Sequence, residues 1–231
     1  ARIGIDLGQR YERYLDSVMS WLGQRDVSAG GVLEVRLGLG AGAQLRRLDA
    51  QFQDVALRHP GGRFDLAGLN GELAFRDDGG NQAASNLGWQ RMGLSGLPMQ
   101  AGRLVGSSHG GELHAQETVV MGLFGGSVSL DDLRVRPFNS DGERVSAAVA
   151  LRDIDMTALA TTFGWPAFPG RLDAKLPRLR YSGERLAVDG QLDIEAFDGS
   201  IDIGGLAIER PFGVAPALSA DVRMRSLDMR P

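Results

Sequence analysis

One short segment of the chain has the spacing of a hydrolase nucleophile elbow: Gly106-Ser107-Ser108-His109-Gly110. An elbow needs a strand before its serine and a helix after it, because the sharp turn between them exposes the hydroxyl. The residues that follow, 111–116, instead alternate between apolar and polar side chains as a strand does. A hairpin turn rich in glycine and serine is therefore the better interpretation, and we expect no catalytic residue and no enzymatic activity.

Two further patterns do not meet the requirements of a cofactor or metal site. The segment 38–42, Gly-Leu-Gly-Ala-Gly, lacks the third glycine of a dinucleotide-binding loop, because that position is Ala43. A flexible turn between strands is the expectation there. The histidines are His59, His109 and His114, and the last two would point to opposite faces of one strand. Metal-ligand spacing and cysteine are both lacking, so we expect no metal and no cofactor.

A carboxylate pair, Asp153 and Asp155, has the residue type needed for acid–base catalysis. Asp155, however, stands directly before a short amphipathic segment, where a helix needs an N-cap, and aspartate is a favoured N-cap residue. Asp6 and Asp228 occupy the same slot in related segments of the chain. Capping explains all three positions, whereas catalysis would have to be repeated three times.

The composition excludes several classes of function. The net charge is −4 and no basic block stands out, so the chain lacks the electrostatic footprint of a nucleic-acid-binding protein. No run approaches the roughly 20 apolar residues that a membrane-spanning helix needs. Glycine is frequent, at 33 residues, and the apolar runs are short, which suits many turns between short strands.

Two stretches of the chain are near-copies of each other. They begin at Phe124-Gly125-Gly126-Ser127-Val128 and at Phe197-Asp198-Gly199-Ser200-Ile201, so that equivalent residue numbers differ by 73 (197 − 124). The match resumes at the same offset, where residues 145–156 lie over residues 218–229. A fixed long period is typical of an architecture built by stacking like units.

The two ends of the chain belong to the same repeating element, since residues 1–7 resemble residues 151–156 and the chain stops shortly after another copy at 227–229. We therefore expect a piece cut from a longer protein. The first repeat unit is residues 1–156, with a helix at about 10–22 followed by antiparallel strands. The second, truncated unit is residues 157–231 and opens with a short helix at 156–163 that ends at Gly164.

The dominant periodicity is two, which gives each strand one apolar and one polar face, as in an antiparallel sheet wetted on one side. Turn signals separate the strands at 59–62, 77–80, 139–142, 182–184 and Gly204-Gly205. The apolar positions of the repeats should share one surface. They are Phe124, Val128, Leu130, Leu133, Val135, Val149, Leu151, Phe197, Ile201, Ile203, Leu206, Ile208, Val222 and Met224. A closed sandwich core and an open apolar groove would bury the same residues, so both remain possible.

The element at 124–135, followed by Leu151-Arg152-Asp153-Ile154-Asp155-Met156 and a short helix, resembles the AsmA-like superfamily of Gram-negative envelope proteins. That group includes AsmA, TamB, YhdP and YdbH, and the segments 62–73 and 87–90 are similar to the YdbH-like branch. Together these segments cover most of the chain. The resemblance implies a mainly β fold: an elongated, curled antiparallel sheet that forms an open groove, built from repeats with short amphipathic helices between them.

The same resemblance implies a function. It predicts a segment of a non-enzymatic lipid-transfer protein that spans the periplasm, in a parent anchored in the inner membrane, and carries phospholipid between the inner and outer membranes. The partners would be phospholipid acyl chains in a groove lined by the apolar positions above, and membrane components reached through missing parts of the parent. The alternative is a structural or interaction β-sandwich repeat of a cell-envelope protein.

Overall fold

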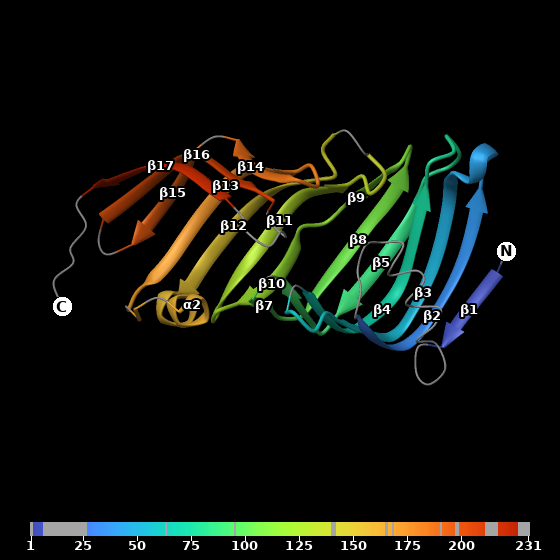
Figure 1. Ribbon diagram of the computed structural model, residues 1–231, viewed down its shortest axis with the longest axis horizontal. Coiled ribbons are helices and arrows are strands. Elements are labelled where there is room, and N and C mark those ends of the chain that lie inside the picture. The colour runs from blue at the N-terminus through green and yellow to red at the C-terminus, as the bar shows by residue number, and fades with distance from the viewer. Residues whose placement is uncertain are drawn as a thin grey trace. The chain divides into compact units, whose positions relative to one another are not determined.

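The computed structural model describes residues 2–6, 27–62, 64–94, 96–139, 142–164, 166–167, 169–189, 191–196, 199–210 and 217–225. The fold is mainly β, and its strands pair antiparallel, as the alternation predicts (Figure 1). The helix predicted at 10–22 lies outside the described residues. The chain divides into two compact units, residues 1–116 and 117–231. The repeat boundary proposed at 156 falls inside the second unit, because the repeats are defined by sequence and the compact units by packing.

The strands of the first unit form one sheet. They are β1 (Arg2–Asp6), β2 (Ser28–Leu39), β3 (Leu45–Arg58), β4 (Phe64–Arg76), β5 (Ala83–Trp89), β6 (Arg91–Leu94), β7 (Leu97–Met99), β8 (Gly102–His109) and β9 (Glu112–Ala115). From β1 to β4 each strand pairs with the next. β4 then pairs with β5 along one part and with β6 along another, and the sheet continues through β8 to β9 and through β7. No described ladder joins β1 to β9, so this sheet does not close on itself.

The second unit has the same construction. Its strands are β10 (Val119–Leu123), β11 (Gly126–Val135), β12 (Val145–Asp155), β13 (Arg171–Tyr181), β14 (Arg185–Asp189), β15 (Gln191–Ala196), β16 (Gly199–Glu209) and β17 (Ala217–Arg225). Sequential strands pair from β10 to β13, and β13 then pairs with β14 along one part and with β15 along another. Both of these pair with β16, which pairs with β17.

A β-bulge in β11 keeps all its apolar residues on one face. Val128 and Leu130 are two residues apart, but Leu133 comes three residues later, which would turn it to the other face of a regular strand. The ladder with β12 shifts between Asp131 and Arg134, and Asp132 has a positive φ of 50°. The bulge adds one residue to β11 at this point and so reverses the alternation of side chains. Leu133 therefore lies on the same face as Leu130.

The repeat predicted from the sequence is reproduced in the strand pairing. Every described pair between β11 and β12 has its counterpart, at the offset of the repeat, between β16 and β17, for example Val128–Leu151 and Ile201–Met224. The bulge recurs as well, because the second ladder shifts between Gly204 and Ala207 and Gly205 has a φ of 59°. The two hairpins therefore share register as well as sequence.

Most turn predictions are confirmed and one is wrong. The segments 59–62, 77–80 and 182–184 lie between consecutive strands. The turn predicted at 38–42 begins later than expected, because Gly38 and Leu39 still belong to β2, and it overlaps the 3-10 turn η1 (Ala41–Ala43). Part of 139–142 lies outside the described residues. Gly204-Gly205 does not end a strand, since both glycines lie within β16. Glycine accepts the positive φ of a bulge as readily as that of a turn, so the dipeptide alone does not distinguish them.

The helix α2 (Met156–Phe163) begins and ends where the sequence predicts. The Asp155 carboxylate accepts a hydrogen bond of 3.0 Å from the Ala158 backbone N–H, which satisfies one of the free donors of the first turn. Gly164 ends the helix in the left-handed region, with φ 69°. Met156 and Ala160 form its buried side. The capping interpretation of Asp155 is therefore confirmed.

Replacing this cap gives a prediction with a small effect. Asp155→Ala should lower the free energy of unfolding by about 1 kcal/mol, because the Ala158 N–H loses its acceptor. Asp155→Asn, which keeps the acceptor, should restore most of the loss. Urea denaturation followed by circular dichroism measures both, and equal losses in the two variants would contradict the capping role.

Candidate functional site: an apolar face on an open sheet

In the second unit, apolar residues from successive strands lie in line across the sheet. Starting from Val128 in β11, the backbone partners are Leu151, Ala174, Ile194, Ile201 and Met224, with Met121 on the other side. Directly opposite residues of an antiparallel pair point to the same face. The register therefore joins these strands into one apolar face, which we call the second apolar face.

The predicted lining residues fall on this face wherever the backbone places them on a strand. On β11 these are Val128, Leu130, Leu133 and Val135; on β12, Val149 and Leu151; on β16, Ile203, Leu206 and Ile208; and on β17, Val222. Phe124 differs, because it forms a two-residue turn with Gly125 in which both φ values are positive. Phe197 lies outside the described residues, and for Ile201 and Met224 only the backbone is described.

Several residues of this face were missed by the sequence reasoning. Val119, Met121 and Leu123 of β10 alternate and are among the most buried residues of the unit. Ile154 and Leu172 lie opposite each other in β12 and β13 and are also buried. The alternation of β10 is visible in the sequence and recurs at the repeat offset in Leu192, Ile194 and Ala196 of β15, but both runs lie just before the two stretches that were compared as near-copies.

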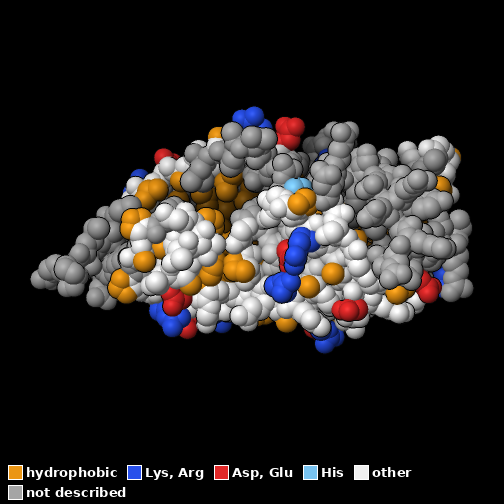
Figure 2. Space-filling model, turned by 60° about the horizontal axis from the view of Figure 1, so that its bottom comes forward, with side chains coloured by type: hydrophobic (Ala, Val, Ile, Leu, Met, Phe, Trp, Pro, Cys, Tyr) orange, Lys and Arg blue, Asp and Glu red, His pale blue; other side chains and the backbone are white. Residues whose placement is uncertain are grey.

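The second apolar face is partly open to solvent. Val222 is 49% exposed although it lies in register with Ile203 on the apolar side of the strand. Figure 2 shows hydrophobic side chains gathered in a hollow at the position along the long axis where Figure 1 draws β11 to β13. Within this unit the described strands are joined by backbone pairing into a single sheet.

The first unit carries an equivalent surface, the first apolar face. Leu33 of β2 lies in line with Phe52, Gly71, Leu87 and Leu104 in successive strands. Bulges at Asp54 (φ 48°) and Gly68 (φ 66°) again keep the apolar residues of β3 and β4 on one side. Leu37 and Leu94 on this face are exposed, at 38% and 39%.

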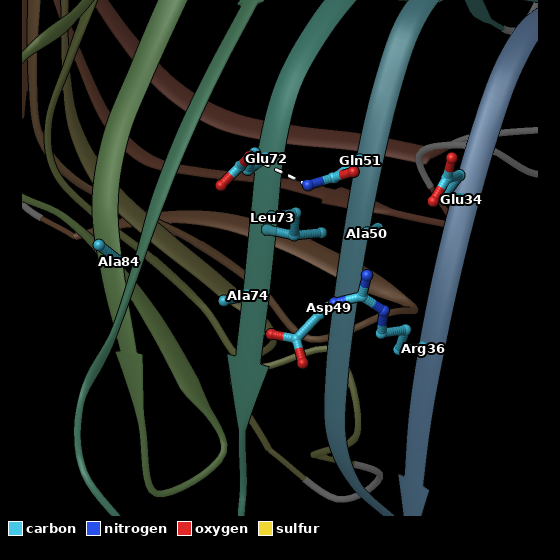
Figure 3. A pocket seen from close by; sticks show the side chains of 9 residues that line it. All are labelled: Glu34, Arg36, Asp49, Ala50, Gln51, Glu72, Leu73, Ala74 and Ala84. Atoms are coloured by element: carbon cyan, nitrogen blue, oxygen red, sulfur yellow. Dashed lines mark hydrogen bonds between the residues drawn. The ribbon is translucent and has the colours of Figure 1, made fainter. Parts of the chain in front are cut away.

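The opposite face of the first unit carries polar side chains, and hydrogen bonds and ion pairs between them connect neighbouring strands. Figure 3 shows a shallow pocket there that includes Glu34 and Arg36 from β2, Gln51 from β3 and Glu72 from β4. Gln51 donates a hydrogen bond of 3.1 Å to Glu72. Nearby, the Arg76 guanidinium lies 2.6 Å from the Asp49 carboxylate. The first pair is exposed and the second is partly buried, and both hold neighbouring strands in register with a modest gain in stability.

Asp65 is the centre of a further cross-strand cluster. Its two carboxylate oxygens lie 3.1 Å from the guanidiniums of Arg91 and Arg58. The hydrogen bond from Arg91, and then that from Arg58, holds the pKa of Asp65 below its usual value in spite of some desolvation. A lowered folded-state pKa stabilises the fold above the unfolded pKa of about 3.9, and this contribution is lost as the pH falls through the folded pKa.

Ser108 does not have the setting of a nucleophile. It lies within β8, fully buried, and its Oγ accepts a hydrogen bond of 3.0 Å from the Arg76 backbone N–H. The turn that follows is Gly110-Gly111, both with positive φ, and it leads into a strand. The hairpin interpretation is confirmed. His109 and His114 lie on the two strands of this hairpin and share a face, contrary to the single-strand expectation, because His114 is in register with Ser107.

The Ser108 hydroxyl joins two strands that have no backbone ladder at this point. We predict that Ser108→Ala lowers the free energy of unfolding by about 1–3 kcal/mol, because the partly buried Arg76 N–H is left without an acceptor. Ser107→Ala on the same strand is the comparison, since the Ser107 Oγ accepts hydrogen bonds from the Gln82 and Gln116 side chains and none from the backbone of a described residue. Chemical denaturation measures both losses. A smaller loss for Ser108→Ala than for Ser107→Ala would contradict this role.

Among the described residues, no group of three or more histidine, cysteine, aspartate or glutamate side chains is placed to hold a metal ion. None of the helices in that part of the chain is long and apolar enough to cross a membrane. Comparison of the chain with protein-family models, with curated proteins and with solved structures finds no match.

Proposed function

We propose that this chain is a segment of a non-enzymatic lipid-transfer protein, in which the apolar faces carry phospholipid acyl chains between the inner and outer membranes of a cell envelope. The observation that supports this most is the second apolar face: a line of apolar residues across one open sheet, with Val222 left 49% exposed. A soluble protein rarely leaves a contiguous apolar surface open unless something binds there.

The energetics of an open apolar surface suit transfer better than storage. Each methylene of an acyl chain gains about 0.8 kcal/mol on leaving water. A chain moving from a bilayer onto valine, leucine and isoleucine side chains exchanges one apolar environment for another, so the step is close to neutral. A face that runs across many strands then lets a chain shift position without returning to water. Periplasmic location and an anchored parent are part of the same proposal and rest on the AsmA-like resemblance.

The second candidate is a structural or interaction repeat of a cell-envelope protein. The polar face of the first unit favours it, because cross-strand contacts such as Arg76–Asp49 and Gln51–Glu72 make that surface regular and rigid. In that case the binding surface would be the polar face or the loops, and the apolar faces would be covered in the assembled protein.

Lipid binding by the purified chain tests the proposal. We expect phospholipid to co-purify and to be identified by mass spectrometry after solvent extraction, and the delipidated chain to take up a fluorescent phospholipid analogue. Uptake should be displaced by unlabelled phospholipid and not by a soluble headgroup such as glycerol phosphate. A chain that carries no lipid and takes up none would overturn the proposal and favour the structural repeat.

A further inference from the structure

The connection between β12 and β13, from Met156 to Gly170, is the longest run of the chain without a charged residue. Charged residues make up 23% of the whole chain, so this run is unusual in its composition. It also carries three aromatic residues, Phe163, Trp165 and Phe168, close together in the sequence. A helix that faces water normally carries charged or polar side chains on its outer side. The composition therefore suits a less polar environment than water.

The segment 156–170, which we call the tip, projects from one end of the strands of the second unit (Figure 1). The Met156 backbone N–H donates a hydrogen bond of 3.1 Å to the Gly170 carbonyl, so the tip leaves the sheet and returns to it at one place. The neighbouring connection at this end, from β10 to β11, is only the two-residue turn Phe124-Gly125. The Asp155 N–H donates a hydrogen bond of 2.9 Å to the Phe124 carbonyl, which places this turn at the base of the tip. The tip, which contains α2, therefore extends beyond the turn beside it.

The outer surface of the tip is open to solvent. Met156 and Ala160 are the buried residues of α2. From 161 to 170 every described residue is exposed, and Phe163 is 43% exposed. The exposed apolar residues of this stretch are Phe163, Pro166, Ala167 and Pro169. Apolar residues that are exposed in a group, and not singly, mark a surface at which something binds.

The polar groups at the end of α2 already have partners within the helix. The Thr161 hydroxyl donates a hydrogen bond of 2.8 Å to the Thr157 carbonyl, and the Thr162 hydroxyl donates one of 2.9 Å to the Ala158 carbonyl. The Gly164 backbone N–H donates one of 3.2 Å to the Thr161 carbonyl. Removing a hydroxyl or an N–H from water costs much less when the group keeps a hydrogen-bond partner. The tip can therefore enter an apolar environment at low cost.

We infer that the tip inserts into the interfacial region of a zwitterionic phospholipid bilayer. Aromatic rings are favoured at the depth of the headgroups, whereas burying a charge in a membrane is costly. The tip offers no cationic side chain to an anionic headgroup, and the chain has a net charge of −4, which an anionic surface repels. A protein partner fits less well, because the rim of a protein interface is polar and the tip has no charge to pair with it.

The tip is continuous with the second apolar face. Ile154 and Leu172 flank the tip, lie opposite each other in β12 and β13, and are buried, at 1% and 9% exposure. A bilayer bound at the tip would therefore lie at one edge of this face. The inference goes beyond the proposed function, since a protein can bind a bilayer without transferring lipid. Only its use as the place where an acyl chain enters the face rests on the proposed function.

Fluorescent labels at single cysteines locate the contact, because the chain has no native cysteine. Thr162→Cys places a label on the tip, and Ser182→Cys places it in the exposed turn at the other end of β13. With vesicles of phosphatidylcholine, the emission of an environment-sensitive dye should shift to shorter wavelength at position 162 and stay unchanged at position 182. No shift at position 162, or equal shifts at the two positions, would overturn the inference.

Phe163→Ser should weaken binding of the complete chain to phosphatidylcholine vesicles by about tenfold, because the aromatic ring no longer leaves water on insertion. The matched control is Phe138→Ser, which removes an aromatic residue that is 55% exposed at the opposite end of β12. Flotation of vesicles with bound protein on a density gradient measures both variants. Equal binding by the two variants would contradict insertion of the tip. Binding that requires an anionic lipid would overturn the inference as well, since it would show attraction by charge.

Uptake of a short-chain fluorescent phospholipid, present as monomers, separates this inference from lipid transfer. Monomers reach the apolar face without a bilayer, so Phe163→Ser should keep this uptake. A chain that takes up the monomers but binds no vesicles would overturn the inference and leave the proposed function in place. Vesicle binding through the tip without any uptake would overturn the proposed function alone. Self-association that Phe163→Ser abolishes, without vesicle binding, would show a second copy at the tip and contradict the inference.

Discussion

Replacing Ile203 with aspartate should reduce phospholipid transfer by about tenfold or more while the protein stays folded. Ile203 is half-buried on the second apolar face, in register with the exposed Val222. An acyl chain that passes this point would have to desolvate a carboxylate, which costs several kcal/mol. Because the face is open, water can reach the carboxylate when no lipid is present, and the loss of stability should stay below about 2 kcal/mol. Transfer of a fluorescent phospholipid between vesicles measures the first effect and a melting curve the second.

The matched control for this variant is Val120→Asp. Val120 is an exposed apolar residue on the polar side of β10, since its neighbours Val119 and Met121 lie on the apolar side. The Val120→Asp variant should therefore keep the lipid-transfer rate and the stability of the unchanged protein. If the surface at Ile203 is instead a closed core, the aspartate would be a buried, unpaired charge and the domain would unfold. A large drop in the melting temperature of Ile203→Asp alone would thus contradict an open face at this position.

Gly71→Val should strongly destabilise the first unit. Gly71 has a φ of 118°, which side chains rarely accept, and a Cβ added there would lie 2.0 Å from the Asn86 carbonyl oxygen. The strained backbone and the overlap with a neighbouring strand together should cost at least about 3 kcal/mol. That corresponds to a fall of about 10 °C or more in the melting temperature of this unit.

Gly30→Val is the matched control, because a Cβ at Gly30 meets no atom within 4 Å and its φ is not in the positive region. Valine suits a strand, so this variant should keep the melting temperature of the unchanged protein. Differential scanning calorimetry of the two variants compares them directly. Equal melting temperatures for Gly71→Val and Gly30→Val would contradict the close approach of β4 to β5 at Gly71.

The parts of the fold that local sequence determines could be predicted, and α2 is the clearest case. Its N-cap Asp155 and its final Gly164 are local signals, because each acts through hydrogen bonds within one turn of the helix. The strands could be predicted for the same reason, since alternation follows from the pleat of a single strand. The lining residues Val128 and Leu151 could be placed on one surface because the repeat supplied the comparison.

What could not be predicted depends on contacts between strands. The pattern of β11 indicates two short alternating runs, at Val128–Leu130 and Leu133–Val135, and only the ladder with β12 shows that a bulge joins them into one strand. The same ambiguity led to the wrong turn at Gly204-Gly205. Phe124 was expected on the apolar surface because it is large and apolar, but the tight connection of β10 to β11 holds it in the turn. Register and bulges are properties of a pair of strands, and no single segment encodes them.

The most direct test of the central claim is site-specific photocrosslinking to lipid. A benzophenone amino acid placed at Leu130 lies on the second apolar face, and the same probe at Ser129 lies on the opposite face of the same strand. With vesicles of phosphatidylethanolamine and phosphatidylglycerol and brief irradiation, we expect a phospholipid adduct at Leu130 and at most a trace at Ser129, detected by mass spectrometry. No adduct at Leu130, or equal adducts at the two positions, would contradict the claim that the apolar face holds acyl chains.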